Sequence, residues 1–142
     1  MADEAKTQAA RKAQSKYDKA ATLDMLKGKK RHETTFSLYL DNDGEEQEVT
    51  LTFRAIGMRE YDRLVGKHPP KTDQRAEGAS FNIDTFAPAL IAACSVEPDL
   101  TEADALEIWN SPDWSRGDLM VLFRNAVDVN NRGLDIPFSA NG

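Results

Sequence analysis

The sequence predicts an α+β fold in which a β-hairpin packs on a small bundle of three to four helices, with a basic N-terminal arm. Three observations support this: polar and apolar residues alternate over 34–54, apolar residues recur at helical spacing over 86–129, and Lys and Arg gather before residue 32. A length of 142 residues suits one domain with tails. We expect an arm at 1–32, one globular α+β domain at 33–131 and a C-terminal tail at 132–142.

The predicted arm is basic, whereas the rest of the chain is acidic. Residues 1–31 carry nine Lys or Arg and four Asp or Glu, a balance of +5, and the whole chain is at −6, so residues 32–142 carry −11. A basic arm suits nucleic acid. Its Ala-rich composition and single aromatic residue instead favour a solvated helix or a disordered segment. We expect no nucleic-acid partner, and we expect residues 1–22 to be mobile.

Two segments of period-two alternation flank a turn sequence, Asp41-Asn-Asp-Gly44, which predicts a β-hairpin with one apolar and one polar face. A lone hairpin is marginal in water, so the apolar face must cover the helices. The polar face carries Tyr39 and Arg54. The inward-facing residues are Phe36, Leu38, Leu51 and Phe53.

The helices are predicted by their caps and their apolar spacing. Thr101 with Asp104, and Ser115 with Asp118, have the spacing of capping boxes. A short helix is expected over residues 58–65, ended by Gly66, and residues 67–80 are expected to form a long, mobile surface loop. Gly133 is the expected end of the last helix. The helical residues predicted to be in the core are Leu64, Phe86, Leu90, Ile91, Leu106, Trp109, Leu122 and Phe123.

The sequence contains no recognisable catalytic or metal-binding constellation. His32 and His68 lack the company of further ligands at the spacing that a zinc site needs. Cys94 lies among apolar residues and is interpreted as a buried, inert thiol. We therefore expect a protein that is not an enzyme and needs no cofactor. The single cysteine fits a reducing cytoplasm, and no apolar run is long enough for a membrane span.

Both tryptophans flank the expected corner between two helices. Trp109 is in register with Leu106 and is assigned to the core. Trp114 has two open interpretations, a corner clamp or an exposed aromatic anchor for a partner, because Trp is enriched at binding hot spots. The tail carries Ile136 and Phe138, which either pack back on the domain or act as a short recognition peptide.

Four segments of the chain carry a resemblance to a known family: Thr52-Phe-Arg-Ala-Ile-Gly57, Glu60-Tyr-Asp-Arg-Leu-Val-Gly-Lys-His-Pro-Pro70, Thr85-Phe-Ala-Pro-Ala-Leu-Ile-Ala-Ala93 and Glu107-Ile-Trp-Asn-Ser-Pro-Asp-Trp-Ser-Arg-Gly117. They resemble the tail assembly chaperones of long-tailed bacteriophages of the siphovirus type. The resemblance covers about residues 23–138 and is carried by fold and surface motifs rather than by a reactive signature.

The resemblance implies a protein of the host cell cytoplasm that binds the tape measure protein, keeps it soluble and promotes polymerisation of the tail tube around it. The tail tube protein is then a second partner, and self-association or a frameshifted longer form stays open. The alternative is a structural tail-completion or neck/connector protein retained in the virion. The candidate partner-binding residues are Tyr39, Arg54, Trp114, Ile136 and Phe138.

Overall fold

The computed structural model describes residues 19–135, and the chain divides into two units, Met1–Lys30 and Arg31–Gly142. The described part of the first unit contains one short helix, α2 (Leu23–Lys27). Thr22 caps this helix, since its hydroxyl oxygen accepts a hydrogen bond from the Met25 N–H at 3.2 Å. The expectation that residues 1–22 are mobile falls almost wholly outside the described residues.

The second unit begins with the predicted β-hairpin. Strands β1 (Glu33–Asn42) and β2 (Glu45–Arg54) pair antiparallel in an unbroken register from Glu33↔Arg54 to Asn42↔Glu45. The two turn residues, Asp43 and Gly44, have φ of 54° and 81°, as a two-residue hairpin loop with left-handed backbone requires. A short third strand, β3 (Ser95–Glu97), extends the sheet on the free side of β2. Strand β3 has only three residues and is not among the predicted elements.

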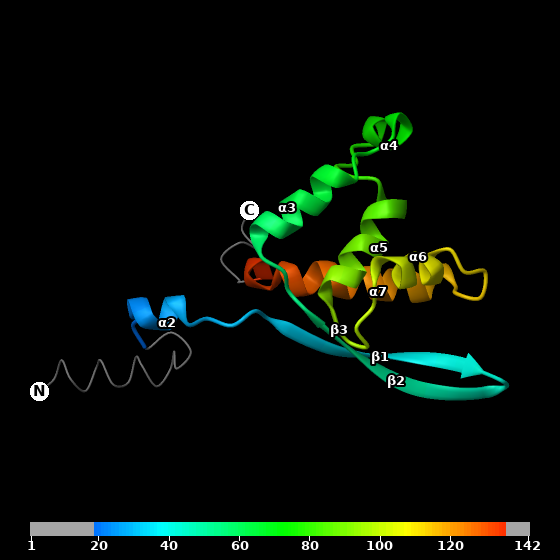
Figure 1. Cartoon of the computed structure of the whole chain (residues 1–142), viewed down its shortest axis with the longest axis horizontal. Coiled ribbons are helices and arrows are strands. Elements are labelled where there is room, and N and C mark those ends of the chain that lie inside the picture. The colour runs from blue at the N-terminus through cyan, green and yellow to red at the C-terminus, as the bar shows by residue number, and fades with distance from the viewer. Residues whose placement is uncertain (1–18, 136–142) are drawn as a thin grey trace, which may run out of the picture. The chain divides into compact units, whose positions relative to one another are not determined.

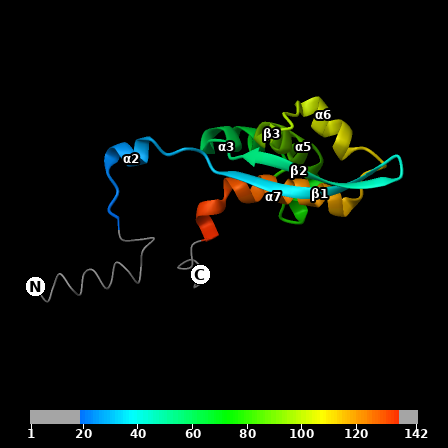
Figure 2. The ribbon, with the colours of Figure 1, turned by 90° about the horizontal axis from the view of Figure 1, so that it is seen from below.

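Helices lie on one face of the sheet, and the other face is open (Figures 1 and 2). Helices α5 and α7 contact the strands directly, while α3 and α6 pack against α5. This arrangement confirms the predicted α+β class, a hairpin packed on a small helical bundle. The helices are α3 (Met58–Lys67), α4 (Thr72–Ala76), α5 (Ile83–Cys94), α6 (Glu102–Trp109), α7 (Arg116–Asn130) and the 3₁₀ turn η2 (Arg132–Asp135).

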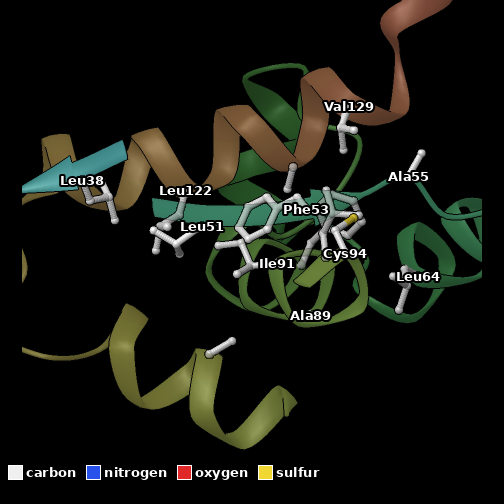
Figure 3. Close-up of a cluster of buried hydrophobic side chains, with 14 residues drawn as sticks. Leu38, Leu51, Phe53, Ala55, Leu64, Ala89, Ile91, Cys94, Leu122 and Val129 are labelled. Atoms are coloured by element: carbon white, nitrogen blue, oxygen red, sulfur yellow. The ribbon is translucent and has the colours of Figure 1, made fainter. Parts of the chain in front are cut away.

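The core is centred on Phe53, which is fully buried between α5 and α7 (Figure 3). Most of the predicted core residues are buried, and Phe36, Trp109 and Phe123 are partly buried and pack against them. Leu106 was wrongly assigned, because it is only half-buried while its neighbour Ala105 is 3% exposed. The predicted residues that are buried are Leu38, Leu51, Phe53, Leu64, Phe86, Leu90, Ile91 and Leu122.

Segment 67–80 is not a loop without structure, because it contains α4. The Gln74 side chain accepts a hydrogen bond from the Lys71 N–H at 2.8 Å and donates one to Asn82 Oδ1 at 3.1 Å. The Asn82 N–H also donates to the His68 carbonyl at 2.8 Å, which closes the segment at its base. These contacts between distant residues hold a short helix that has no apolar periodicity of its own.

Two helix ends also differ from the prediction. Helix α3 runs through Gly66 to Lys67, and the His68 N–H then bonds the Val65 carbonyl. Helix α7 stops at Asn130, before Gly133. Asn131 is the C-cap residue, and its backbone N–H at 3.1 Å and its side-chain amide at 2.8 Å both donate to the Val127 carbonyl.

Candidate interaction surface

A groove of about 310 Å³ lies between the hairpin and the helices, and nine of its ten lining residues are apolar. Its volume is at the low end of the range for small-ligand pockets, so it suits a few inserted side chains. We call it the apolar groove. Its lining residues are Leu38, Leu40, Val49, Thr50, Leu51, Pro98, Leu100, Ile108, Trp114 and Leu122.

The strand side of the apolar groove follows from the alternation in the hairpin. Leu38 is paired with Val49, so their side chains share the helix-facing side of the sheet, and Leu40 lies two residues further along it. Leu38 is 5% exposed, whereas Leu40 is only half-buried. The hairpin therefore carries its apolar stripe beyond the part that the helices cover.

The opposite side is built by the connection from β3 to α6. Ser95 accepts a hydrogen bond from the Leu100 N–H at 2.9 Å, which folds the connection over and holds Pro98 and Leu100 at the groove. Helix α6 then starts at a complete capping box between Thr101 and Asp104. The predicted box at this position is confirmed, and the two bonds to Thr101 lower the pKa of the exposed Asp104 carboxyl.

Trp114 stands in the connection from α6 to α7, half-buried, where it packs against the core and lines the apolar groove. It also lines a second surface hollow beside Trp109 and Met120. The turn around it is held by Ser111, whose hydroxyl accepts from the Asp113 N–H at 3.2 Å and whose carbonyl accepts from the Trp114 N–H at 3.3 Å. Trp114 therefore packs at the corner between the two helices and also lines the groove, while its role as an anchor for a partner stays a prediction.

The structure does not bring the other candidate residues to Trp114. Tyr39 and Arg54 lie on the outward face of the hairpin, where Tyr39 is 62% exposed. Six residue pairs separate them along the strands, which is about 20 Å. Arg54 is also engaged by Glu33 at 3.2 Å across the strands. Ile136 and Phe138 lie outside the described residues.

Acidic residues flank the apolar groove. Along the chain, the immediate neighbours of its lining residues include six exposed carboxylates and no Lys or Arg, but Asp41 and Glu48 adjoin inward-facing strand residues and so lie on the outward face of the hairpin. An apolar floor with a negative surround favours an apolar ligand that also carries positive charge. The other four, outside the hairpin, are Glu97, Asp99, Glu107 and Asp113.

Asn130 is a structural residue that the sequence analysis missed. Its side-chain oxygen accepts from the Ile56 N–H at 2.8 Å, and its amide donates to the Ala126 carbonyl at 2.7 Å and to Cys94 Sγ at 3.2 Å. One side chain thus joins α7 to α5 and to the segment after β2. A helical Asn near a helix end gives no local signal for such a role.

Cys94 is fully buried, as the sequence predicts. Burial raises the pKa of its thiol, because the thiolate is poorly solvated there, and the Asn130 amide offsets part of the effect. His68 packs edge-on to Phe86, with ring centres 6.4 Å apart. Within residues 19–135 the His, Cys, Asp and Glu side chains form no group of three or more that could hold a metal ion.

Comparisons with family models, curated proteins and solved structures found nothing that matches this chain. None of the described helices is long and apolar enough to cross a membrane.

Proposed function

We propose that this protein is a tail assembly chaperone, which binds a helical segment of the tape measure protein in the apolar groove and keeps it soluble. The observation that carries the proposal is a groove with nine apolar lining residues on a body of strong negative charge. The resemblance described in the sequence analysis supplies the identity of the client. The tail tube protein is proposed as the second partner. It would replace the chaperone on the client as the tube polymerises around the client.

The shape and chemistry of the groove fit an amphipathic helix. Such a helix inserts side chains from one stripe, at positions i, i+3, i+4 and i+7, into an apolar groove. Trp114 would provide the aromatic anchor, since large half-buried aromatic residues dominate interface energetics. The flanking carboxylates favour client segments with Lys or Arg beside the apolar stripe, and they keep the complex soluble.

Co-expression with fragments of the tape measure protein tests the proposal. The intact protein should move fragments from the insoluble to the soluble fraction. Trp114→Ala and Leu40→Lys should reduce that effect, because the first removes the anchor and the second places a charge in the groove. Met58→Lys is the matched control, since Met58 is 76% exposed and lies outside the groove.

If fragments stay insoluble with the intact protein present, the chaperone function is rejected. If Trp114→Ala and Leu40→Lys both behave as Met58→Lys does, the function stands and the groove is the wrong surface. Mass spectrometry of purified particles separates the alternative, because a neck or connector protein is present in stoichiometric amounts and a chaperone is not.

A further inference from the structure

Strand β1 leaves one long edge of the sheet unpaired. The strand order is β1-β2-β3, so β1 pairs with β2 on one side only. The ladder continues to His32, whose carbonyl accepts a hydrogen bond from the Ala55 N–H at 2.8 Å, so the even-numbered residues of β1 bond β2. The N–H and C=O groups of the odd-numbered residues point to the free edge, and no other element among residues 19–135 bonds them. These residues are Glu33, Thr35, Ser37, Tyr39 and Asp41.

This edge lacks the features that keep exposed strands from pairing with another chain. Natural proteins protect such edges with Lys, Pro, bulges or very short strands. Strand β1 instead has ten residues in an unbroken register with β2, and it contains no Lys, Pro or Gly. Residues 34–40 carry no charge and include two Thr and two aromatic residues, which favour strands. The edge is therefore suited to accept a further strand.

The other segments of the same chain are poorly suited to pair with this edge. Only residues 28–32 separate α2 from β1, which is too short for a reversal and a paired strand. The sequence of residues 1–18 contains no Val, Ile, Phe or Trp, which are common in strands. At the other terminus Pro137, between Ile136 and Phe138, has no N–H to donate to a ladder. A second copy offers a β1 strand with the same alternation.

The alternation and the charges of β1 restrict how two copies of the strand can pair. Antiparallel pairing keeps the apolar side chains on one face only when a residue lies opposite its own copy at the two-fold axis. With Ser37 at the axis, Glu33 would lie opposite Asp41 at both ends. With Leu38 at the axis, Glu33 would lie opposite Asp43. Both registers oppose like charges, which is destabilising.

The register with Phe36 at the axis is complementary in charge. Asp41 then lies opposite Arg31, which is exposed and belongs to the same unit as the strand. Glu33 lies opposite the uncharged Tyr39. The pairing extends over residues 31–41 of both copies and forms about twelve main-chain hydrogen bonds. Charge complementarity therefore favours a second copy in this register.

Helix α7 leaves room for this pairing. It contacts β1 and β2 about equally, so it lies over the space between them. Since strands are about 4.8 Å apart, two copies of α7 would lie roughly 10 Å apart, which is an ordinary helix-packing distance. Phe123 packs toward Phe86 of α5, and the opposite flank of α7 carries Val121, 37% exposed, between Asp118 and Asp128. The helices thus allow the pairing, and the strands hold it.

We propose that two copies of this chain associate through β1, which pairs with itself antiparallel about Phe36 and joins the two three-stranded sheets into one. The same edge serves both copies, so the assembly closes as a two-fold dimer. Both helical layers then lie on one face of the joined sheet. This proposal does not rest on the proposed function, and no client takes part in it.

Sedimentation velocity of the full chain without client tests the proposal. The wild-type protein should shift from monomer to dimer as its concentration rises. Ser37→Pro should raise the dimer Kd at least about ten-fold, because it removes an N–H from the centre of the free edge. That N–H points away from β2, so the far-UV circular dichroism of the variant should match the wild type. Ser37→Ala keeps the N–H and is the matched control, with an unchanged Kd.

Exchange of charges tests the register. Arg31→Asp and Asp41→Arg should each raise the dimer Kd about three-fold or more, because each places like charges opposite one another at both ends of the pairing. The double variant carries the same two charges in exchanged positions, so it should recover the wild-type Kd. Without that recovery the register about Phe36 is rejected.

Disulfide cross-linking identifies the contact itself. Thr35 lies opposite Ser37 of the other copy in this register, so Thr35→Cys mixed with Ser37→Cys should cross-link more than Ser37→Cys alone, while the native Cys94 stays buried. A monomer at every concentration, a Ser37→Pro protein that folds and dimerises like the wild type, or a preferred cross-link between two copies of Ser37→Cys would each overturn the proposal.

Discussion

The two ends of the hairpin's apolar stripe have the same alternation but different surroundings. At one end Phe53 is fully buried, with Phe36 edge-on at 4.8 Å between ring centres and α5 and α7 packed around it. At the other end Leu40 is half-buried and lines a groove of about 310 Å³. The period-two alternation determines which face of a strand is apolar. Whether the chain itself covers that face depends on how far its helices reach.

The largest predicted contrast concerns thiol accessibility at the two ends. In a Leu40→Cys variant, the new thiol should react quickly with Ellman's reagent, while Cys94 should react only when the protein opens. The ratio of the rates should reach roughly a thousand-fold or more, because exchange at a buried site follows the free energy of opening. Stopped-flow absorbance on the single variant measures both thiols in one sample.

The pKa of Cys94 determines the pH at which this assay should be run. Burial raises the pKa of the Cys94 thiol above the ordinary value of a cysteine. When the thiol pKa is higher in the folded than in the unfolded state, the protein keeps its full stability below the unfolded-state pKa. The stability falls as the pH rises from there through the folded-state pKa. Near-neutral pH therefore keeps Cys94 protonated and the protein at full stability. Equal rates for the two thiols would mean that the core end is as open as the groove.

Truncation of the core aromatic should give the largest loss of stability. Phe53→Ala should lower the free energy of unfolding by about 3–5 kcal/mol, since it leaves a cavity where the side chain was fully buried. Tyr39→Ala, at an exposed aromatic on the outward face of the same hairpin, should change it by about 0.5 kcal/mol or less. Urea denaturation measures both. Similar losses at the two positions would contradict the assignment of the faces.

A substitution at Asn130 tests the hydrogen bonds at the buried end of the hairpin's apolar stripe. Asn130→Ala should cost about 1–3 kcal/mol, because it leaves the partly buried Ile56 N–H without its acceptor. Asn125→Ala is a matched control on the same helix. Asn125 makes the same kind of bond to the carbonyl four residues earlier, that of Val121 at 2.8 Å, in an exposed position. If the two variants have the same denaturation midpoint, the Asn130 side chain does not join α7 to the segment after β2.

The elements that the sequence predicts are those with local signals. The hairpin follows from alternation and from an Asp-Gly turn that accommodates positive φ. The start of α6 follows from Thr101 and Asp104, which satisfy each other's N–H groups within four residues. In each case the stabilising contact lies within the window in which the pattern is visible.

The missed features depend on contacts between distant residues. Strand β3 has three residues and forms only because β2 offers a free edge. Helix α4 depends on Gln74 reaching Asn82, eight residues away. The apolar groove is a space between elements, so no single pattern encodes it. Trp114 was a candidate from its residue type, but the groove that it lines became visible only in the fold.

Among the inward-facing residues of the hairpin, the smallest predicted effect is at the wall of the groove. Leu40→Ala should cost about 0.5–1 kcal/mol, because a half-buried side chain beside an unfilled space loses little transfer free energy and leaves no closed cavity. Leu90→Ala on α5, at a residue that is 0% exposed, should cost about 2–5 kcal/mol. Urea denaturation should be run at a protein concentration where only monomer is present, so that association does not add to the stability. A cost at Leu40 equal to that at Leu90 would mean that the groove is closed in solution, and it would then have no room for a client helix.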